Sequence, residues 1–224
     1  FNWDLAGKAL FVPVGNAGNI TAVMSGLLKM RRLGIISDLP RLFGVQSEHA
    51  DPVWRYYSKP KAERVYSAVT VRPSVAQAAI IGNPVSFPRV KKLVDVYEAE
   101  GGEFGVVQVT EQAIMDAAII ANRHGHIVCT QGGECLAGLL KAREEAADEK
   151  AVLDSTAHAL KFAGFQNMYF TDTFPPEYGV TPDAGLANRP SLVVDASEKA
   201  RLSAEEFTRA AAKAVADRLE LAGK

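Results

Sequence analysis

The residues best suited to chemistry gather in the stretch "VPVGNAGNITA" (residues 12–22), where an apolar run leads into a loop of two glycines and two asparagines. Where such a loop joins a parallel strand to a helix, the first helical amides lack partners, and with the helix dipole they favour an anion. Glycine lets the backbone approach a phosphate closely, and asparagine adds a donor or accepts a left-handed turn. Residues 15–19 therefore predict an anion site, with a plain strand-to-helix turn as the alternative.

The spacing of this loop argues against the two common nucleotide motifs. Gly15 and Gly18 are three residues apart and each is followed by asparagine, so the dinucleotide pattern G-x-G-x-x-G is absent. A phosphate loop of the type G-x-x-x-x-G-K is missing as well. We therefore expect neither dinucleotide binding nor nucleotide hydrolysis.

Two other groups of polar residues are weaker candidates. His124 and His126 flank a glycine at a predicted helix end, where they are expected to cap helix carbonyls, and we find no further ligands that would complete a metal site. Glu48 and His49 follow a predicted strand at the edge where α/β proteins bind ligands. For these two residues a solvated loop is the favoured interpretation.

The elements that position these residues alternate between β-rich runs and amphipathic stretches, which is typical of a parallel sheet covered by helices. We expect strands over 9–14, 41–46, 104–109, 126–130 and 150–156, and helices over 18–34, 51–57, 85–102, 111–125, 132–148 and 202–224. Thr110 is the expected N-cap of its helix, and Ser203 with Glu206 forms a capping box. The sequence predicts an α/β fold, with a mostly parallel open sheet flanked by helices, in a single domain over residues 1–224.

Composition narrows the class of partner. The 25 lysines and arginines nearly balance the 26 aspartates and glutamates, so no general attraction to nucleic acid or to an anionic membrane is expected. No apolar stretch approaches the roughly 20 residues that span a bilayer, and the start does not read as a signal peptide. Cys129 and Cys135 are too few for a disulfide framework and are expected to be reduced, buried thiols. We expect a cytoplasmic protein without nucleic-acid or membrane partners.

The loop also resembles the phosphate-binding loop of threonine synthases, pyridoxal-phosphate enzymes of the β-family (fold type II), in which a G-N-x-G-N motif holds the cofactor phosphate through backbone amides. Four more stretches resemble the family in the family's order: "LPRLFGVQSEHADPV", "SVAQAAIIGNPVSFPRV", "VVQVTEQAIMDAAIIANRHGHIVCTQGGECLAGLLK" and "VLDSTAHALKF". Together they cover most of residues 10–161, and the resemblance is weak downstream of about Phe162. It implies pyridoxal 5'-phosphate as cofactor, with the phosphate held by Gly15, Asn16, Ala17, Gly18 and Asn19.

The last stretch is similar to the family motif V-L-x-x-T-G-H-G-L-K, whose threonine hydrogen-bonds the pyridine nitrogen of the cofactor; the matching residue is Thr156. A hydroxyl at this place leaves the nitrogen largely unprotonated and helps to steer β- and γ-replacement chemistry. Alternatively, Thr156 closes a strand end by bonding nearby backbone. Ala157 and Ala159 replace family glycines and change the room beside the ring, and His158 is expected to be structural.

The resemblance also implies a missing part. In the family the Schiff-base lysine lies well before the phosphate loop, and none of Lys8, Lys29 and Lys161 matches its position. We therefore assign no catalytic residue and no metal ligand, and expect the chain to be the C-terminal part of the large cofactor-binding domain, inert by itself. The N-terminal part and the small domain are expected upstream, and apolar surface left uncovered by them favours a homo-oligomer or another partner.

The reaction implied by the resemblance converts O-phospho-L-homoserine and water to L-threonine and phosphate, so the expected substrate is a small molecule. Two alternatives stay open. One is another fold type II enzyme, such as a threonine or serine dehydratase or a diaminopropionate ammonia-lyase. The other is a non-catalytic α/β module that binds an anion.

Overall fold

The structure is a computed structural model that describes residues 5–145, 150–187 and 193–221. Its contacts divide the chain into two compact units, Phe1–Ala187 and Asn188–Lys224. All of the strands described below lie in the first unit. The single domain expected over residues 1–224 stays a prediction.

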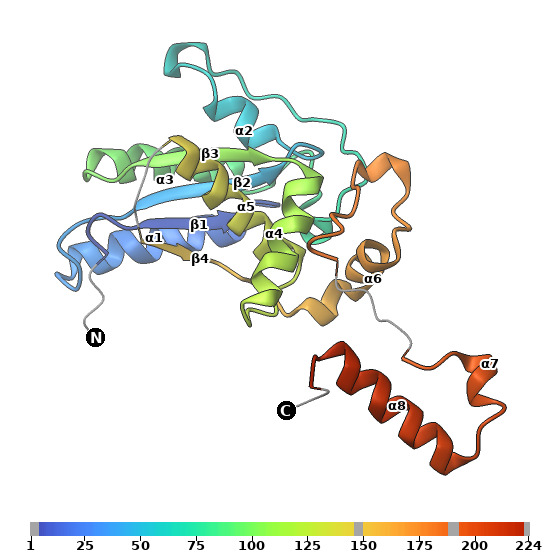
Figure 1. Cartoon of the computed structure of the whole chain (residues 1–224). Coiled ribbons are helices and arrows are strands. Elements are labelled where there is room, and N and C mark those ends of the chain that lie inside the picture. The colour runs from blue at the N-terminus through green and yellow to red at the C-terminus, as the bar shows by residue number, and fades with distance from the viewer. Residues whose placement is uncertain (1–4, 146–149, 188–192, 222–224) are drawn as a thin grey trace. The chain divides into compact units, whose positions relative to one another are not determined.

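The first unit is built on a parallel sheet of four strands in the order β3-β2-β1-β4 (Figure 1). The strands are β1 (Ala9–Pro13), β2 (Arg41–Ser47), β3 (Phe104–Val109) and β4 (Ala151–Leu153). In the register, Leu10 of β1 lies opposite Leu42 on one side and Val152 on the other. The predicted α/β fold with a parallel sheet is confirmed, and the carboxyl ends of all strands share one edge.

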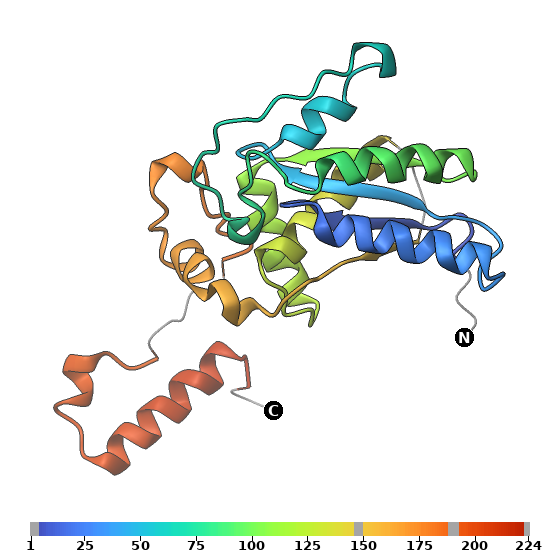
Figure 2. The same cartoon turned by 180° about the vertical axis from the view of Figure 1, so that it is seen from behind.

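Helices cover both faces of this sheet. Figure 1 and the view from behind in Figure 2 show α1 and α3 on one face and α4 and α5 on the other. The helices of the first unit are α1 (Gly18–Arg32), α2 (Pro52–Tyr57), α3 (Phe87–Ala99), α4 (Glu111–Arg123), α5 (Thr130–Glu145) and α6 (Ala163–Thr171). Short 3-10 turns are η1 (Lys61–Glu63), η2 (Gln77–Ala79), η3 (Ala159–Phe162) and η4 (Pro176–Tyr178).

The alternation of side chains along β1 produces two apolar layers. Val12 packs with the α1 and α3 side, which includes Met24 and Val94, whereas Phe11 packs with the α4 and α5 side, which includes Ile114. Each fully buried side chain of this kind stabilises the fold by about 1.5–3 kcal/mol relative to an exposed one. The sheet is therefore held from both faces, and this fixes the positions of its strand ends.

Two helix starts have the caps that their sequences predict. The Thr110 hydroxyl accepts a hydrogen bond from the amide of Ala113 at 3.1 Å. In the second unit, Ser203 and Glu206 form the reciprocal capping box of α8 (Ala204–Arg218), which follows the short helix α7 (Ala196–Lys199). The expected helix ends at 146–148 and 222–224 lie outside the described residues.

The strand expected over 126–130 is wrong. Val128 makes a single antiparallel bridge with His158, and α5 already begins at Thr130. The segment pairs with the loop after β4 instead of joining the sheet, because the Cys129 amide donates to the Ala157 carbonyl at 2.8 Å. The strand expected over 150–156 is shorter than predicted and ends at Leu153.

None of the described helices combines the length and the apolar character that crossing a bilayer requires.

Candidate functional site

A pocket of about 330 Å³ lies at the edge of the sheet where β1 ends and the chain leaves β4. It brings together all the residues that the sequence assigns to the cofactor, residues 15–19 and Thr156. The lining residues are Pro13, Gly15, Asn16, Ala17, Gly18, Asn19, Ala78, Ala79, Gln131, Thr156, Ala157 and Lys161.

The loop over residues 15–19 has the backbone that an anion site needs. Ala17 is left-handed, with φ of 62°, and no side chain caps the start of α1. The first turn of α1 itself contains no acidic residue. A Cβ atom on Gly15 would lie 3.0 Å from the Ala79 Cα and 3.1 Å from the Ala78 carbonyl oxygen, so a larger residue would have to push the backbone of η2 outward by a few tenths of an ångström. These features suit a phosphate at the helix N-terminus.

Thr156 forms the opposite wall of the pocket. Its φ of 49° is left-handed, which is rare for a β-branched residue. The Thr156 amide donates to the Asp154 carboxylate at 3.0 Å, and the hydroxyl lies 3.3 Å from the Cys129 sulfur. Asp154 also accepts a hydrogen bond from the side-chain amide of Asn19 at 2.5 Å. Asp154 therefore connects the Thr156 backbone to Asn19 in the loop over residues 15–19.

Gln131 is a pocket residue that the sequence analysis did not assign. It is buried in the first turn of α5. In the side-chain orientation that satisfies both of its amide atoms, the Gln131 oxygen accepts from the amides of Gln77 and Ala78, at 3.1 and 3.0 Å. Gln131 thus ties η2 to α5. Its only sequence signal is its place just after an apolar run, which does not distinguish it from other polar residues.

The solvated loop favoured for Glu48 and His49 is wrong for His49. That side chain is 6% exposed, and its Nδ1 atom lies 2.5 Å from the Pro73 carbonyl oxygen. It is buried because the segment after η1 folds back over the end of β2, where the Glu111 carboxylate lies 3.8 Å from the ring. Glu111 in turn accepts hydrogen bonds from the Ser47 hydroxyl and the Val75 amide.

Glu134 extends this buried polar group from α5. Its side chain is fully buried, and neither carboxylate oxygen has a hydrogen-bond partner within the described part of the chain. Burial, and secondly the nearby Glu111 carboxylate, raises the pKa of Glu134 well above its usual value. The folded protein therefore favours the neutral acid at this position.

Both cysteines are buried and free, as predicted. Cys129 lies beside Thr156, whereas Cys135, a residue of α5, packs in the apolar layer on the α4 and α5 side of the sheet. Burial raises the pKa of the Cys135 thiol well above its usual value, so this cysteine is a poor nucleophile.

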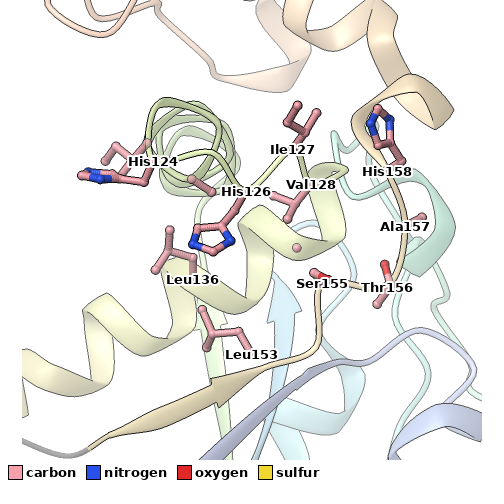
Figure 3. Close-up of a pocket in the computed structure, with 13 residues that line it drawn as sticks. His124, His126, Ile127, Val128, Leu136, Leu153, Ser155, Thr156, Ala157 and His158 are labelled. Carbon is pink, nitrogen blue, oxygen red and sulfur yellow. The ribbon is translucent and has the colours of Figure 1, made fainter.

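A second cavity, of about 870 Å³, lies on the other side of Thr156 (Figure 3). Figure 3 shows His124 and His126 at the end of α4 and in the turn after it, and His158 on the segment after β4, with the three rings apart from one another. Among the residues that the structure describes, no three His, Cys, Asp or Glu are grouped to hold a metal ion. The His158 ring accepts a hydrogen bond from the Leu160 amide at 3.1 Å, and its structural role stays a prediction. At His124 the backbone amide, rather than the ring, bonds the last carbonyls of α4.

Comparison with known proteins gives the class to which this site belongs. The family model described as "Pyridoxal-phosphate dependent enzyme" matches residues 4–154. The chain therefore belongs to the pyridoxal-phosphate-dependent enzymes, and the predicted cofactor, pyridoxal phosphate, is confirmed at the level of the family.

Among curated proteins, the chain is similar to threonine synthases. It is 33% identical to threonine synthase 2, chloroplastic, of Arabidopsis thaliana over 165 residues, which are 72% of this chain and 31% of that protein. It is 34% identical to the threonine synthase of Methanocaldococcus jannaschii over 164 residues, which are 71% of this chain and 38% of that protein. The chain spans about a third of the length of these relatives.

Solved structures show the same fold. The threonine synthase from Escherichia coli matches with a TM-score of 0.55 at 19% identity, over 85% of this chain and 41% of that one. The processed form of threonine deaminase isoform 2 from Solanum lycopersicum matches with a TM-score of 0.53 at 18% identity, over 74% and 41%. The similar structures are fold type II enzymes with more than one activity. The likeness therefore supports the fold and does not identify the reaction.

Proposed function

We propose that this chain is the cofactor-binding portion of a threonine synthase, in which residues 15–19 hold the phosphate of pyridoxal phosphate and Thr156 faces its pyridine nitrogen. One observation carries the proposal. Residues 15–19, which follow β1, and Thr156, which follows β4, line the same pocket. The identities of 33% and 34% to threonine synthases favour this enzyme over a dehydratase or an ammonia-lyase.

The chain's own residues would bind the cofactor at its two ends. Backbone amides of residues 15–19 would donate to the phosphate oxygens, and the positive end of the α1 dipole would add to their attraction. The Thr156 hydroxyl would donate to the pyridine nitrogen, which would stay largely unprotonated because no carboxylate partner holds a proton on it. When bound, the cofactor supplies an electron sink for carbanions of the amino-acid substrate.

The reaction that we propose for the whole enzyme converts O-phospho-L-homoserine and water to L-threonine and phosphate. The Schiff-base lysine of this reaction is expected outside the present chain, although Lys161 lines the pocket. We therefore expect the chain alone to bind the cofactor without covalent attachment and to release no phosphate from O-phospho-L-homoserine. A visible absorbance of lysine-bound cofactor, or measurable threonine formation, would show that this expectation is wrong.

A titration with pyridoxal phosphate tests the site. A Cβ atom on Gly18 meets nothing within 4 Å, so Gly18→Leu is expected to fold while its side chain takes up room in the pocket. Gly26, in the middle of α1 and outside the pocket lining, also has open space and gives the matched control Gly26→Leu. We expect Gly18→Leu to weaken binding by at least about tenfold, the loss of a strong hydrogen bond or more, and Gly26→Leu to bind as the wild type does.

Wild-type affinity in Gly18→Leu would contradict the phosphate assignment and favour the plain turn. Binding of inorganic phosphate without any preference for pyridoxal phosphate would favour the non-catalytic anion module. The cytoplasmic location and the homo-oligomer stay predictions, the second of which size-exclusion chromatography would test.

A further inference from the structure

Asp154 joins the two walls of the pocket. One carboxylate oxygen accepts from the Asn19 side-chain amide at 2.5 Å, and the other accepts from the Thr156 backbone amide at 3.0 Å. The Asp154 backbone is itself fixed, because its amide donates to the carbonyl of Phe11 in β1 at 3.0 Å. The Asp154 side chain thus connects Asn19, at the end of the loop over residues 15–19, to Thr156.

The conformation of Thr156 explains why such a connection matters. A β-branched residue with φ of 49° is strained and keeps that conformation only where its surroundings hold it. An aspartate that accepts from the amide two residues later forms an Asx-turn, which holds a tight turn of this kind. Because the acceptor is charged, both of its hydrogen bonds are stronger than neutral ones.

We propose that Asp154 is a positioning residue that fixes the phosphate loop and the Thr156 hydroxyl at a set separation, so that both ends of the cofactor are held as one unit. The cofactor part of this inference rests on the proposed function, whereas the connection between the two walls is a property of the chain itself. One consequence is that the side chain of Asn19 is engaged by Asp154, which leaves its backbone amide, rather than its side chain, for the phosphate.

Two substitutions separate positioning from mere folding. Asp154→Ala removes both hydrogen bonds. Asp154→Asn keeps an oxygen for the Thr156 amide, and its new amide group can donate to Asn19 once the Asn19 amide has rotated. Positioning therefore predicts that asparagine rescues what alanine loses.

The first measurement is the affinity of the full chain for pyridoxal phosphate, followed by fluorescence. We expect Asp154→Ala to weaken binding by about tenfold or more and Asp154→Asn by no more than about threefold, as for the loss and the weakening of charge-assisted bonds. Asn19→Ala added to Asp154→Ala should cost almost nothing further, because the two residues share one interaction. Asp95→Ala is the control, since Asp95 is a surface carboxylate whose side chain is 64% exposed and which does not line the pocket.

The second measurement needs no ligand. Amide hydrogen exchange of Thr156 in the free chain should speed up about tenfold or more in Asp154→Ala and stay close to wild type in Asp154→Asn, because the lost bond is the one that this amide donates. Wild-type exchange at Thr156 in folded Asp154→Ala would overturn the inference, and so would wild-type affinity.

The two measurements also separate this inference from the proposed function. If the wild-type chain does not bind pyridoxal phosphate, the proposed function fails for this chain, while the exchange rate of Thr156 still decides whether Asp154 holds the turn. If Asp154→Ala does not fold, Asn19→Ala decides, because it removes only one of the two bonds. It is expected to weaken binding several-fold, and wild-type affinity in Asn19→Ala would then overturn the inference.

Discussion

At the scale of single residues, Glu134 stands out because its ionisable carboxyl group is fully buried. It has no hydrogen-bond partner within the described residues, and its pKa is raised by burial and by Glu111. An ionised carboxylate in such a place would be costly, so the folded chain keeps the proton while the unfolded chain releases it. The free energy of unfolding therefore depends on pH through Glu134, and the substitution Glu134→Gln would remove this dependence.

Glu134→Gln tests this term. Above the ordinary glutamate pKa of about 4.3, the folded wild type binds more protons than the unfolded chain, so its free energy of unfolding falls as the pH rises. We expect the stability of Glu134→Gln relative to wild type to increase by up to about 1.4 kcal/mol per pH unit as the pH rises above about 4.3, until the folded wild type releases the Glu134 proton. Urea unfolding at several pH values measures the difference, with Glu63→Gln on the surface as control. A difference that does not change with pH would refute the neutral state.

At the scale of elements, α4 and α5 pack directly against each other beside the site. This packing depends on Gly133, where a Cβ atom would lie 2.6 Å from the Ile114 carbonyl oxygen and 2.7 Å from the Ala118 Cβ. The obstructing atoms belong to the backbone and the first side-chain carbon of α4, so they cannot turn away. The helices can approach this closely only because position 133 has no side chain.

Gly133→Ala should therefore destabilise the chain by about 1–3 kcal/mol through overpacking, although alanine is the better helix former. The matched control is Gly164→Ala in α6, where nothing lies within 4 Å of the added atom and the change should stabilise by up to about 1 kcal/mol. Chemical denaturation compares the two. Equal effects of the two substitutions would show that propensity, not packing, decides at position 133.

What the sequence could predict at this scale is what short segments encode. Periodic apolar residues predicted the parallel sheet and most of its helices. Thr110 predicted the start of α4, because an N-cap depends only on residues of the first helical turn. The run over 126–130 is as apolar as a strand, but its partner is the loop at Ala157, which periodicity does not show. Burial of His49 likewise depends on Pro73, which lies 24 residues further on.

The same limit applies to the site. Residues 15–19 form a contiguous motif, so the sequence assigned them together, and Thr156 followed from a second motif. Asp154 and Gln131 were missed because each contacts a partner far away in sequence; Asp154 and Asn19 are 135 residues apart. No pattern in the neighbouring sequence shows that Asp154 connects Asn19 with Thr156.

At the scale of the whole molecule, the pocket lining lies entirely in the first compact unit. The second unit has its own contacts, and its longest described helix, α8, has no buried residue. The chain's affinity for the cofactor should therefore reside in the first unit.

Ending the chain after Ala187 tests this division. We expect the shortened chain to bind pyridoxal phosphate within about twofold of the full chain, because none of the pocket hydrogen bonds described above comes from residues 193–221, and even one would cost several-fold. Gly18→Leu in the shortened chain is the control for specific binding. An affinity that falls by tenfold or more would show that residues 188–224 contribute to the site.

The strand order has a consequence for how the site comes into being. β1 and β4 are the first and last strands of the described sheet along the chain, and yet they are neighbours. Such non-local pairing forms slowly, because a long loop must close before the contact is gained. A chain emerging from the ribosome cannot complete the pocket until Thr156 has left the exit tunnel and β4 has docked. Cofactor capture would then come last and would stabilise the finished topology by mass action.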